Sequence, residues 1–130
     1  MPSVDVVEEP IRERVGSDLR AIIAYDGREY DCTLRDDLAE QYSESEIRRI
    51  VNRSIVIQLG VRDHPSSLKT GDLDALVRTY EDAWLVGCPA PNRRKSGVLV
   101  SVARNGGDAT FADVDECVRV LEDAVDEAIA

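Results

Sequence analysis

The alternation of apolar and polar residues predicts a β-hairpin early in the chain. Residues 19–25 and 28–34 carry apolar side chains at every second position, which is the period of a strand with one buried face. Asp26 and Gly27 between them form a two-residue turn typical of hairpins, because both can take positive φ. The predicted pairs, from the turn outward, are Tyr25 with Arg28, Ile23 with Tyr30, Ala21 with Cys32 and Leu19 with Leu34.

The two faces of this hairpin differ in polarity. One face is apolar, and Cys32 points into it. The other places Ile22 and Ala24 near Asp31 and Glu29, so it is expected to be mostly solvated.

An amphipathic helix is predicted after the hairpin. Ser43 and Glu46 have the spacing of a capping box at its start, and Gly60 marks its end. The polar residues 61–72, which include the single histidine His64, read as a loop. The apolar seam of the helix consists of Ile47, Ile50, Val51, Ile55 and Leu59.

Two further helices are predicted near the ends of the chain. Residues 8–16 form a short helix with Pro10 near its first position. Thr110 and Asp113 form a capping box for a long final helix. Its seam consists of Val114, Cys117, Val118, Leu121 and Val125.

Strand-like patterns fill the region between the two long helices. Residues 73–91 divide into two runs around Glu81 and Asp82, and their aromatic and β-branched residues favour strands. Residues 73–80 also fit two helical turns. Residues 98–102 alternate as a third strand, which gives the order α-β-β-α-β-β-β-α and an α+β fold class. The 130 residues are expected to form a single domain, with residues 1–7 flexible.

This order of elements resembles that of the roadblock family, whose small profilin-like domains carry helices on a five-stranded antiparallel sheet. The resemblance covers nearly the whole chain but rests on element order alone. It implies dimerisation through a helix and an edge strand, and a role in binding small GTPases or scaffolding complexes. The related PAS and GAF domains imply the alternative of a small-ligand-sensing regulatory domain.

The charge of the chain indicates its medium. It has 26 acidic and 16 basic side chains, a net charge of −10, and Lys69 and Lys95 are its only lysines. Such a surface repels itself in dilute buffer, whereas molar salt shortens the Debye length to about 3 Å and screens the repulsion. The composition resembles that of proteins from haloarchaea, which keep molar salt in their cytoplasm.

Candidate chemistry is sparse. Cys32, Cys88 and Cys117 lack metal-ligand spacing and are expected to be buried thiols, and His64 is predicted to lie in a loop, away from them. The acids of residues 26–37 lack the register of a calcium loop, and the glycines before Asp108 are interpreted as a turn. No nucleotide or hydrolase motif is present, so a non-enzymatic protein without a cofactor is expected.

One segment carries the opposite charge to the rest. Arg93, Arg94 and Lys95 form the basic patch, which is interpreted as a solvated loop or as a contact for an acidic partner. Three cations are too few to hold nucleic acid at high salt, so nucleic-acid binding is not expected. Trp84 and Tyr80 are expected to be packed, and Trp84 becomes a partner anchor if it is exposed.

The expected function is therefore a cytoplasmic protein-interaction or scaffold module. No window approaches the 18 or so apolar residues of a membrane span. A homodimer is expected, because five strands leave two edges and the final helix carries a second apolar stripe, made of Val120, Ala124 and Ala128.

Overall fold

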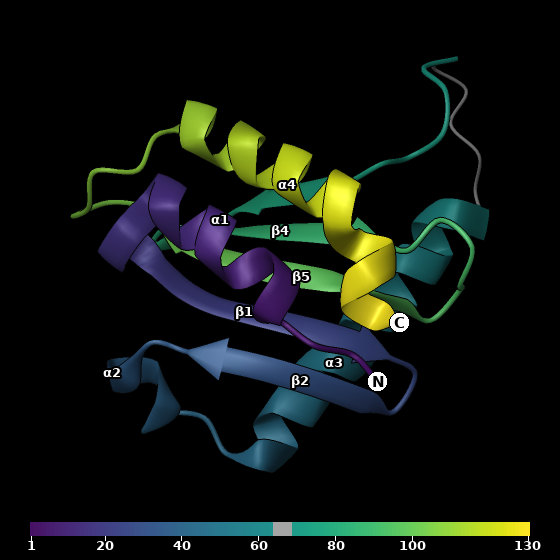
Figure 1. Cartoon of the computed structure of the whole chain (residues 1–130), viewed down its shortest axis with the longest axis horizontal. Helices are drawn as coiled ribbons and strands as arrows, with labels where there is room; N and C mark the ends of the chain where they lie inside the picture. Colours follow the sequence, from purple (N-terminus) through teal and green to yellow (C-terminus); the bar gives the residue numbers. More distant parts are fainter. Residues whose placement is uncertain (64–68) are drawn as a thin grey trace.

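The computed structural model confirms the α+β class and the order of elements (Figure 1). It describes residues 1–63 and 69–130, so His64 lies outside the described residues. The sheet has five strands in the order β2-β1-β5-β4-β3, and each neighbouring pair is antiparallel. The strands are β1 (Leu19–Asp26), β2 (Glu29–Leu34), β3 (Leu76–Thr79), β4 (Ala83–Pro89) and β5 (Ser96–Ala103).

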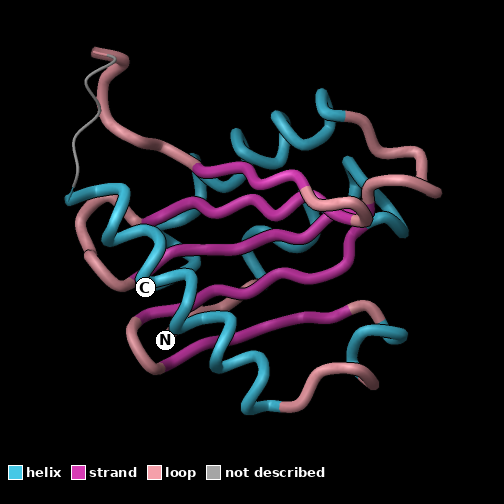
Figure 2. Tube along the Cα trace, turned by 180° about the vertical axis from the view of Figure 1, so that it is seen from behind, coloured by secondary structure: helices cyan, strands magenta, loops and turns pink. Residues whose placement is uncertain are grey.

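Helices lie on both faces of the sheet. One face is covered by α1 (Asp5–Val15) and α4 (Phe111–Ile129), which lie beside each other in Figure 1. The long helix α3 (Glu44–Asp63) lies on the opposite face, which Figure 2 shows from its own side. A 3₁₀ turn η1 (Gly16–Asp18) joins α1 to β1, and a single-turn helix α2 (Asp36–Ala39) follows β2.

The face under α1 and α4 holds the larger core. Its helices bury Val7, Ile11 and Leu121 against Val86 and Val100 of the sheet, all completely. Ser3 N donates to Ala128 O (2.7 Å), and Val4 is buried nearby, yet the flexibility expected of residues 1–7 stays a prediction.

The hairpin forms, but its turn lies one residue later than expected. The turn residues are Gly27 and Arg28, so Tyr25 pairs with Tyr30 and Ile23 with Cys32. Gly27 takes φ of +63°, as expected, while Arg28 needs no positive φ, which is the pattern of a turn with glycine first. Because the partner strand shifts by two residues, each side chain stays on the face predicted for it.

The solvated face predicted for the hairpin is wrong at β1. Ile22 and Ala24 are completely buried under the two helices. The edge strand β2 presents Asp31 on this face, and Asp31 accepts a hydrogen bond from Val4 N (2.9 Å). A central strand with a helix layer on each face is buried on both sides, which the pattern of one hairpin does not show.

The helix boundaries are partly as predicted. Both capping boxes form: Ser43 with Glu46, and Thr110 with Asp113. Helix α3 nevertheless runs past Gly60 to Asp63, since an interior glycine costs only about 1 kcal/mol. The helix predicted over residues 8–16 begins earlier, at Asp5, and ends at Val15. Helix α2 was not predicted. Residues 76–79 are a strand, so the helical alternative for this region is wrong there.

Candidate functional site

The basic loop after β4 is built into the fold. Arg93 Nη1 lies 3.0 Å from a carboxylate oxygen of Asp26 and 3.3 Å from Ile129 O at the end of α4. Arg62 of α3 donates to Arg93 O (3.2 Å), and Gly27 N donates to Lys95 O (2.9 Å). Arg93, Arg94 and Lys95 are all exposed, as a contact for a partner requires.

Trp84 lies at the other end of β4 and does not join this loop. It is buried (7% exposed), and its ring packs edge-on against Phe111 at a centroid distance of 6.4 Å. The Arg104 guanidinium lies 5.8 Å from the Trp84 ring. Tyr80, which was expected to be packed, is 49% exposed because it stands at the β3–β4 turn beyond the helices.

The carboxylates of the hairpin have separate partners. Asp26 pairs with Arg93 and accepts from Ser96, Asp31 accepts from Val4 N, and Asp37 pairs with Arg35 at 2.7 Å. The Arg35 guanidinium lowers the pKa of the exposed Asp37 carboxyl. Over residues 1–63 and 69–130, no three histidine, cysteine or acidic side chains gather as a metal site would require.

The three thiols are separate and protonated. Burial raises the pKa of Cys88 on β4 to about 12 and that of Cys117 on α4 to about 11, and both side chains are buried in the core between α4 and the sheet. Cys32 on β2 is half-buried, and desolvation raises its pKa as well. A raised pKa keeps a thiol in its unreactive form, so nothing in these environments activates a nucleophile.

The glycine-rich turn before α4 binds a carboxylate of the chain itself. Asp18 accepts hydrogen bonds from Asp108 N and Ala109 N, both at 2.8 Å. A Cβ on Gly107 would lie 2.1 Å from the Asp18 carboxylate, so only glycine permits this approach. The segment is therefore a turn, as the sequence pattern indicated. The backbone amides of Asp108 and Ala109 bind Asp18 and so hold η1 against this turn.

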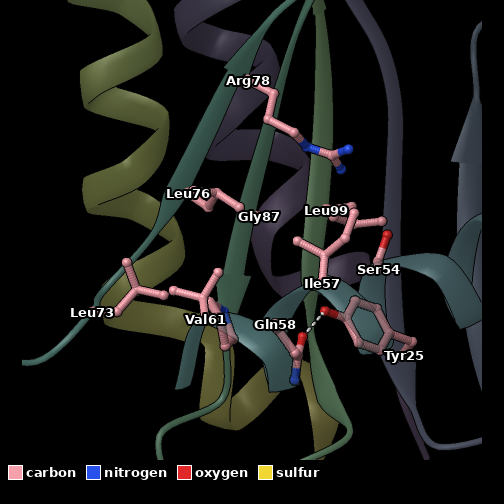
Figure 3. A pocket seen from close by; sticks show the side chains of 11 residues that line it. Tyr25, Ser54, Ile57, Gln58, Val61, Leu73, Leu76, Arg78, Gly87 and Leu99 are labelled. Atoms are coloured by element: carbon pink, nitrogen blue, oxygen red, sulfur yellow. Dashed lines mark hydrogen bonds between the residues drawn. The ribbon is translucent and has the colours of Figure 1, made fainter. Parts of the chain in front are cut away.

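A buried polar cluster joins α3 to the β4–β5 loop. Tyr25 Oη donates to Gln58 Oε1, and Gln58 Nε2 donates to Arg94 O (2.8 Å) and Ser96 O (3.2 Å) (Figure 3). Burial raises the pKa of Tyr25 far above its ordinary value, which keeps its hydroxyl a donor. Gly97 lies against this cluster, since a Cβ there would come within 2.8 Å of Tyr25 Oη.

Apolar side chains continue from this cluster toward the edge strand β3. Ile57 and Val61 of α3 and the side chains of Leu73 and Leu76 line a hollow of about 20 Å³, which has room for about one water molecule. Figure 3 shows these four side chains together with Tyr25 and Gln58. Val61 is 38% and Leu73 39% exposed, and Val56 on the outer surface of α3 is 68% exposed. We call Val61, Leu73 and strand β3 the α3–β3 surface.

A larger cavity lies at the other end of the same sheet face. Its volume is about 450 Å³, and it opens between the first turns of α3, helix α2 and the β3–β4 turn. The sheet contributes Ile23, Leu85 and Leu99 to its walls, and α3 contributes Ile47 and Ile50. Mostly apolar cavities of this size are the kind that bind small molecules.

The residues of these two sites were not predicted from the sequence. The sequence pattern predicts a loop at Val61 and a strand at Leu73, whereas Val61 belongs to α3 and Leu73 precedes β3. The predicted second stripe of α4 is wrong as a free surface: Ala128 is buried, and Val120 and Ala124 pack against the core.

Comparison with known proteins supports the fold. Residues 5–126 match the family described as domain of unknown function DUF7522. The chain belongs to this family. No curated protein sequence matches it.

Within the part of the chain that is described, no helix has both the length and the apolar character needed to cross a membrane.

A solved structure gives the same architecture. The crystal structure of MglC from Myxococcus xanthus, a roadblock-fold protein, is similar with a TM-score of 0.50 and 14% identity over 92% of this chain and 99% of the other. At this identity the likeness shows the fold, which is roadblock-like, as the order of elements predicted.

Proposed function

We propose that the DUF7522 chain is a single-domain, non-enzymatic scaffold that dimerises through the α3–β3 surface. The observation that carries this proposal is the continuity between exposed apolar side chains and an unpaired strand edge. Val61 of α3 and Leu73, both partly exposed, lie beside Leu76 of β3, which is the last strand of the sheet. A second copy related by a two-fold axis would cover the same residues on both chains.

The two edges of the sheet are not equally suited to pairing. The edge strand β2 carries Glu29 and Asp31, and two such strands would bring like charges together. The edge strand β3 reads Leu-Val-Arg-Thr and has no acidic residue. In a chain with a net charge of −10, the acid-free edge is the one that can approach a copy of itself.

Backbone groups on β3 support the same choice. Tyr80 N donates to Ala83 O (2.8 Å), so residue 80 is bonded to β4. Because bonding alternates along an antiparallel strand, Val77 and Thr79 direct their backbone N–H and C=O groups away from β4. These groups are available to extend the sheet into a second copy.

Concentrated salt favours this type of interface. Exposed ion pairs weaken when the Debye length falls, whereas apolar contacts persist or strengthen. The acidic composition supports a cytoplasm with molar salt as the working medium. The exposed Arg93, Arg94 and Lys95 are the proposed contact for an acidic protein partner. A small GTPase is the partner class that the roadblock resemblance implies.

The test is light scattering in about 3 M KCl on the wild type and three variants. We expect twice the chain mass of 14.4 kDa for the wild type. Two variants should give monomers. Val61→Glu puts a charge on the α3–β3 surface. Thr79→Pro removes a backbone N–H that points away from β4, so the loss affects pairing with a second copy and no bond within the sheet. Asn52→Glu is the control, because it adds the same charge to α3 at an exposed position on the side away from β3.

Circular dichroism of each sample separates loss of the dimer from loss of the fold. We also expect the wild-type melting temperature to rise from low to molar KCl as the surface charge is screened. A monomeric wild type at micromolar concentrations would refute the dimer. A melting temperature independent of salt would refute the proposed medium.

A further inference from the structure

We propose that the 450 Å³ cavity on the α3 face binds an amphiphilic carboxylate, an aliphatic body with one carboxylate head, and that Arg20 binds the head group. This site is separate from the α3–β3 surface and adds a function to the scaffold. The argument rests on the position of Arg20, on its unused donors and on the lining of the cavity.

A β-bulge places Arg20 in the cavity wall. Leu19 pairs with Val102, but the next pair is Ala21 with Ser101, so β1 contains one extra residue at this point. Regular alternation would direct residue 20 to the same face as Ile22, under α1 and α4. Instead Arg20 and Ala21 both line the cavity on the α3 face. Bulges are frequent next to functional sites because they redirect a side chain.

The guanidinium of Arg20 uses only part of its hydrogen-bonding capacity within the described residues. Its Nε donates to Ser101 Oγ at 3.2 Å, which orients the group. Within residues 1–63 and 69–130, no carboxylate pairs with Arg20, although the chain has 26 acidic residues. A half-buried guanidinium with its outer nitrogens unused favours a carboxylate, which it can bind with two parallel hydrogen bonds.

The rest of the lining fits an aliphatic body. Ile23, Leu85 and Leu99 form the floor, and Ile47 and Ile50 form a wall. Tyr42 and Tyr80, which are 37% and 49% exposed, also line the cavity and lie toward its opening. The two carboxylates of the lining, Glu81 and Asp82, are exposed to solvent at the β3–β4 turn, where water screens them.

The turn that bounds the cavity is held in place by the strands and loop beside it. Arg104 Nη1 donates to Tyr80 O (3.1 Å), and Asn105 Nδ2 donates to Glu81 O. Arg78 Nη1 donates to Tyr80 Oη (3.0 Å) and its guanidinium lies 5.9 Å from the Tyr80 ring centre. A wall fixed in this way keeps the cavity formed before a ligand enters, which reduces the cost of binding.

The experiment is a titration of the full ¹⁵N-labelled chain with decanoate, followed by amide chemical shifts at a salt concentration where the protein is folded. The comparison probes are 1-decanol and decyltrimethylammonium, which share the chain length and differ in the head group. We expect decanoate to shift amides around the cavity, such as those of Ala21, Ile47 and Leu85, and to bind at least about tenfold more tightly than either comparison probe.

Variants test the role of Arg20. Arg20→Gln should weaken decanoate binding by about tenfold to a hundredfold and leave 1-decanol binding unchanged. Arg20→Lys should retain part of the affinity, because it keeps the charge but loses the planar fork. Arg119→Gln is the matched control, since it removes one exposed positive charge from α4 on the opposite face and should have no effect.

Several results would overturn the inference. These are equal binding of decanoate and 1-decanol, shifts confined to other parts of the chain, equal losses in Arg20→Gln and Arg119→Gln, or no binding of decanoate by the folded wild type. The comparison of probes needs no variant, so it decides the question even if Arg20→Gln does not fold.

Discussion

The two faces of the sheet are covered to very different degrees. Among the described residues, the α1 and α4 face gathers twenty buried hydrophobic residues in one cluster, whereas the α3 face gathers six. Two helices lie on the first face and one long helix on the second (Figures 1 and 2). The uncovered part of the α3 face contains the cavity and adjoins the exposed side chains of the α3–β3 surface. One face is therefore mainly packed core, and the other leaves apolar side chains exposed to solvent.

Polar groups follow the same division. The α3 face contains the buried cluster of Tyr25 and Gln58 and the bulged Arg20. The other face is almost entirely apolar, with Cys88 and Cys117 as its buried thiols. Buried polar groups need fixed partners, so they define the position of α3 more than they stabilise it.

The largest expected difference is between matched leucine truncations on the two faces. Leu121→Ala removes a completely buried side chain from α4 and should cost about 2–5 kcal/mol of unfolding free energy. Leu85→Ala at the cavity should cost about 1 kcal/mol, because Leu85 is half-buried and water already reaches it. Denaturant titration in molar salt measures both. Equal costs would mean that the α3 face is as well packed as the other.

A methyl group at Gly97 tests how tightly the polar cluster is built. Gly97→Ala places a Cβ 2.7 Å from Cys88 O and 2.8 Å from Tyr25 Oη, so it should destabilise the fold by about 1–3 kcal/mol. Gly60→Ala on the exposed side of α3 meets no atom within 4 Å and should stabilise the fold by up to about 1 kcal/mol. Thermal melts of the two variants should shift in opposite directions, and a harmless Gly97→Ala would show that the cluster is loose.

The smallest expected effect is a loss of stability at alkaline pH that originates on the α1 and α4 face. Burial raises the pKa of Cys88 to about 12 and of Cys117 to about 11, from an ordinary 9.0. Below pH 9 the thiols are protonated in both the folded and the unfolded protein. Above pH 9 the unfolded protein releases these protons while the folded protein keeps them. The free energy of unfolding therefore falls as the pH rises toward the raised pKa values.

The expected loss is on the order of 1–2 kcal/mol between about pH 8 and pH 9.5. Unfolding free energies measured at the two pH values should show it, and the variant with Cys88→Ala and Cys117→Ala should lose most of the dependence. Cys32→Ala on the half-buried β2 strand is the control and should leave most of it. An unchanged slope in the double variant would assign the effect to other groups.

The sequence by itself determined the order of elements and most of their inward faces. The capping boxes of α3 and α4, the seam of α4 and the alternation in β2 and β5 form as predicted, because caps and periodicity depend on neighbours within one element. It also determined the acidic surface, which depends on composition alone.

Only the tertiary structure decided which surfaces remain free. Ile22 and Ala24 are buried because two helices cover β1, and the stripe of Val120 and Ala124 packs against the core. Arg20 lines a cavity because of a bulge that depends on pairing with β5, eighty residues away along the chain. Contacts between distant segments depend on how whole helices and strands pack against one another. The hydrophobic period of a single element does not indicate which other element will cover it.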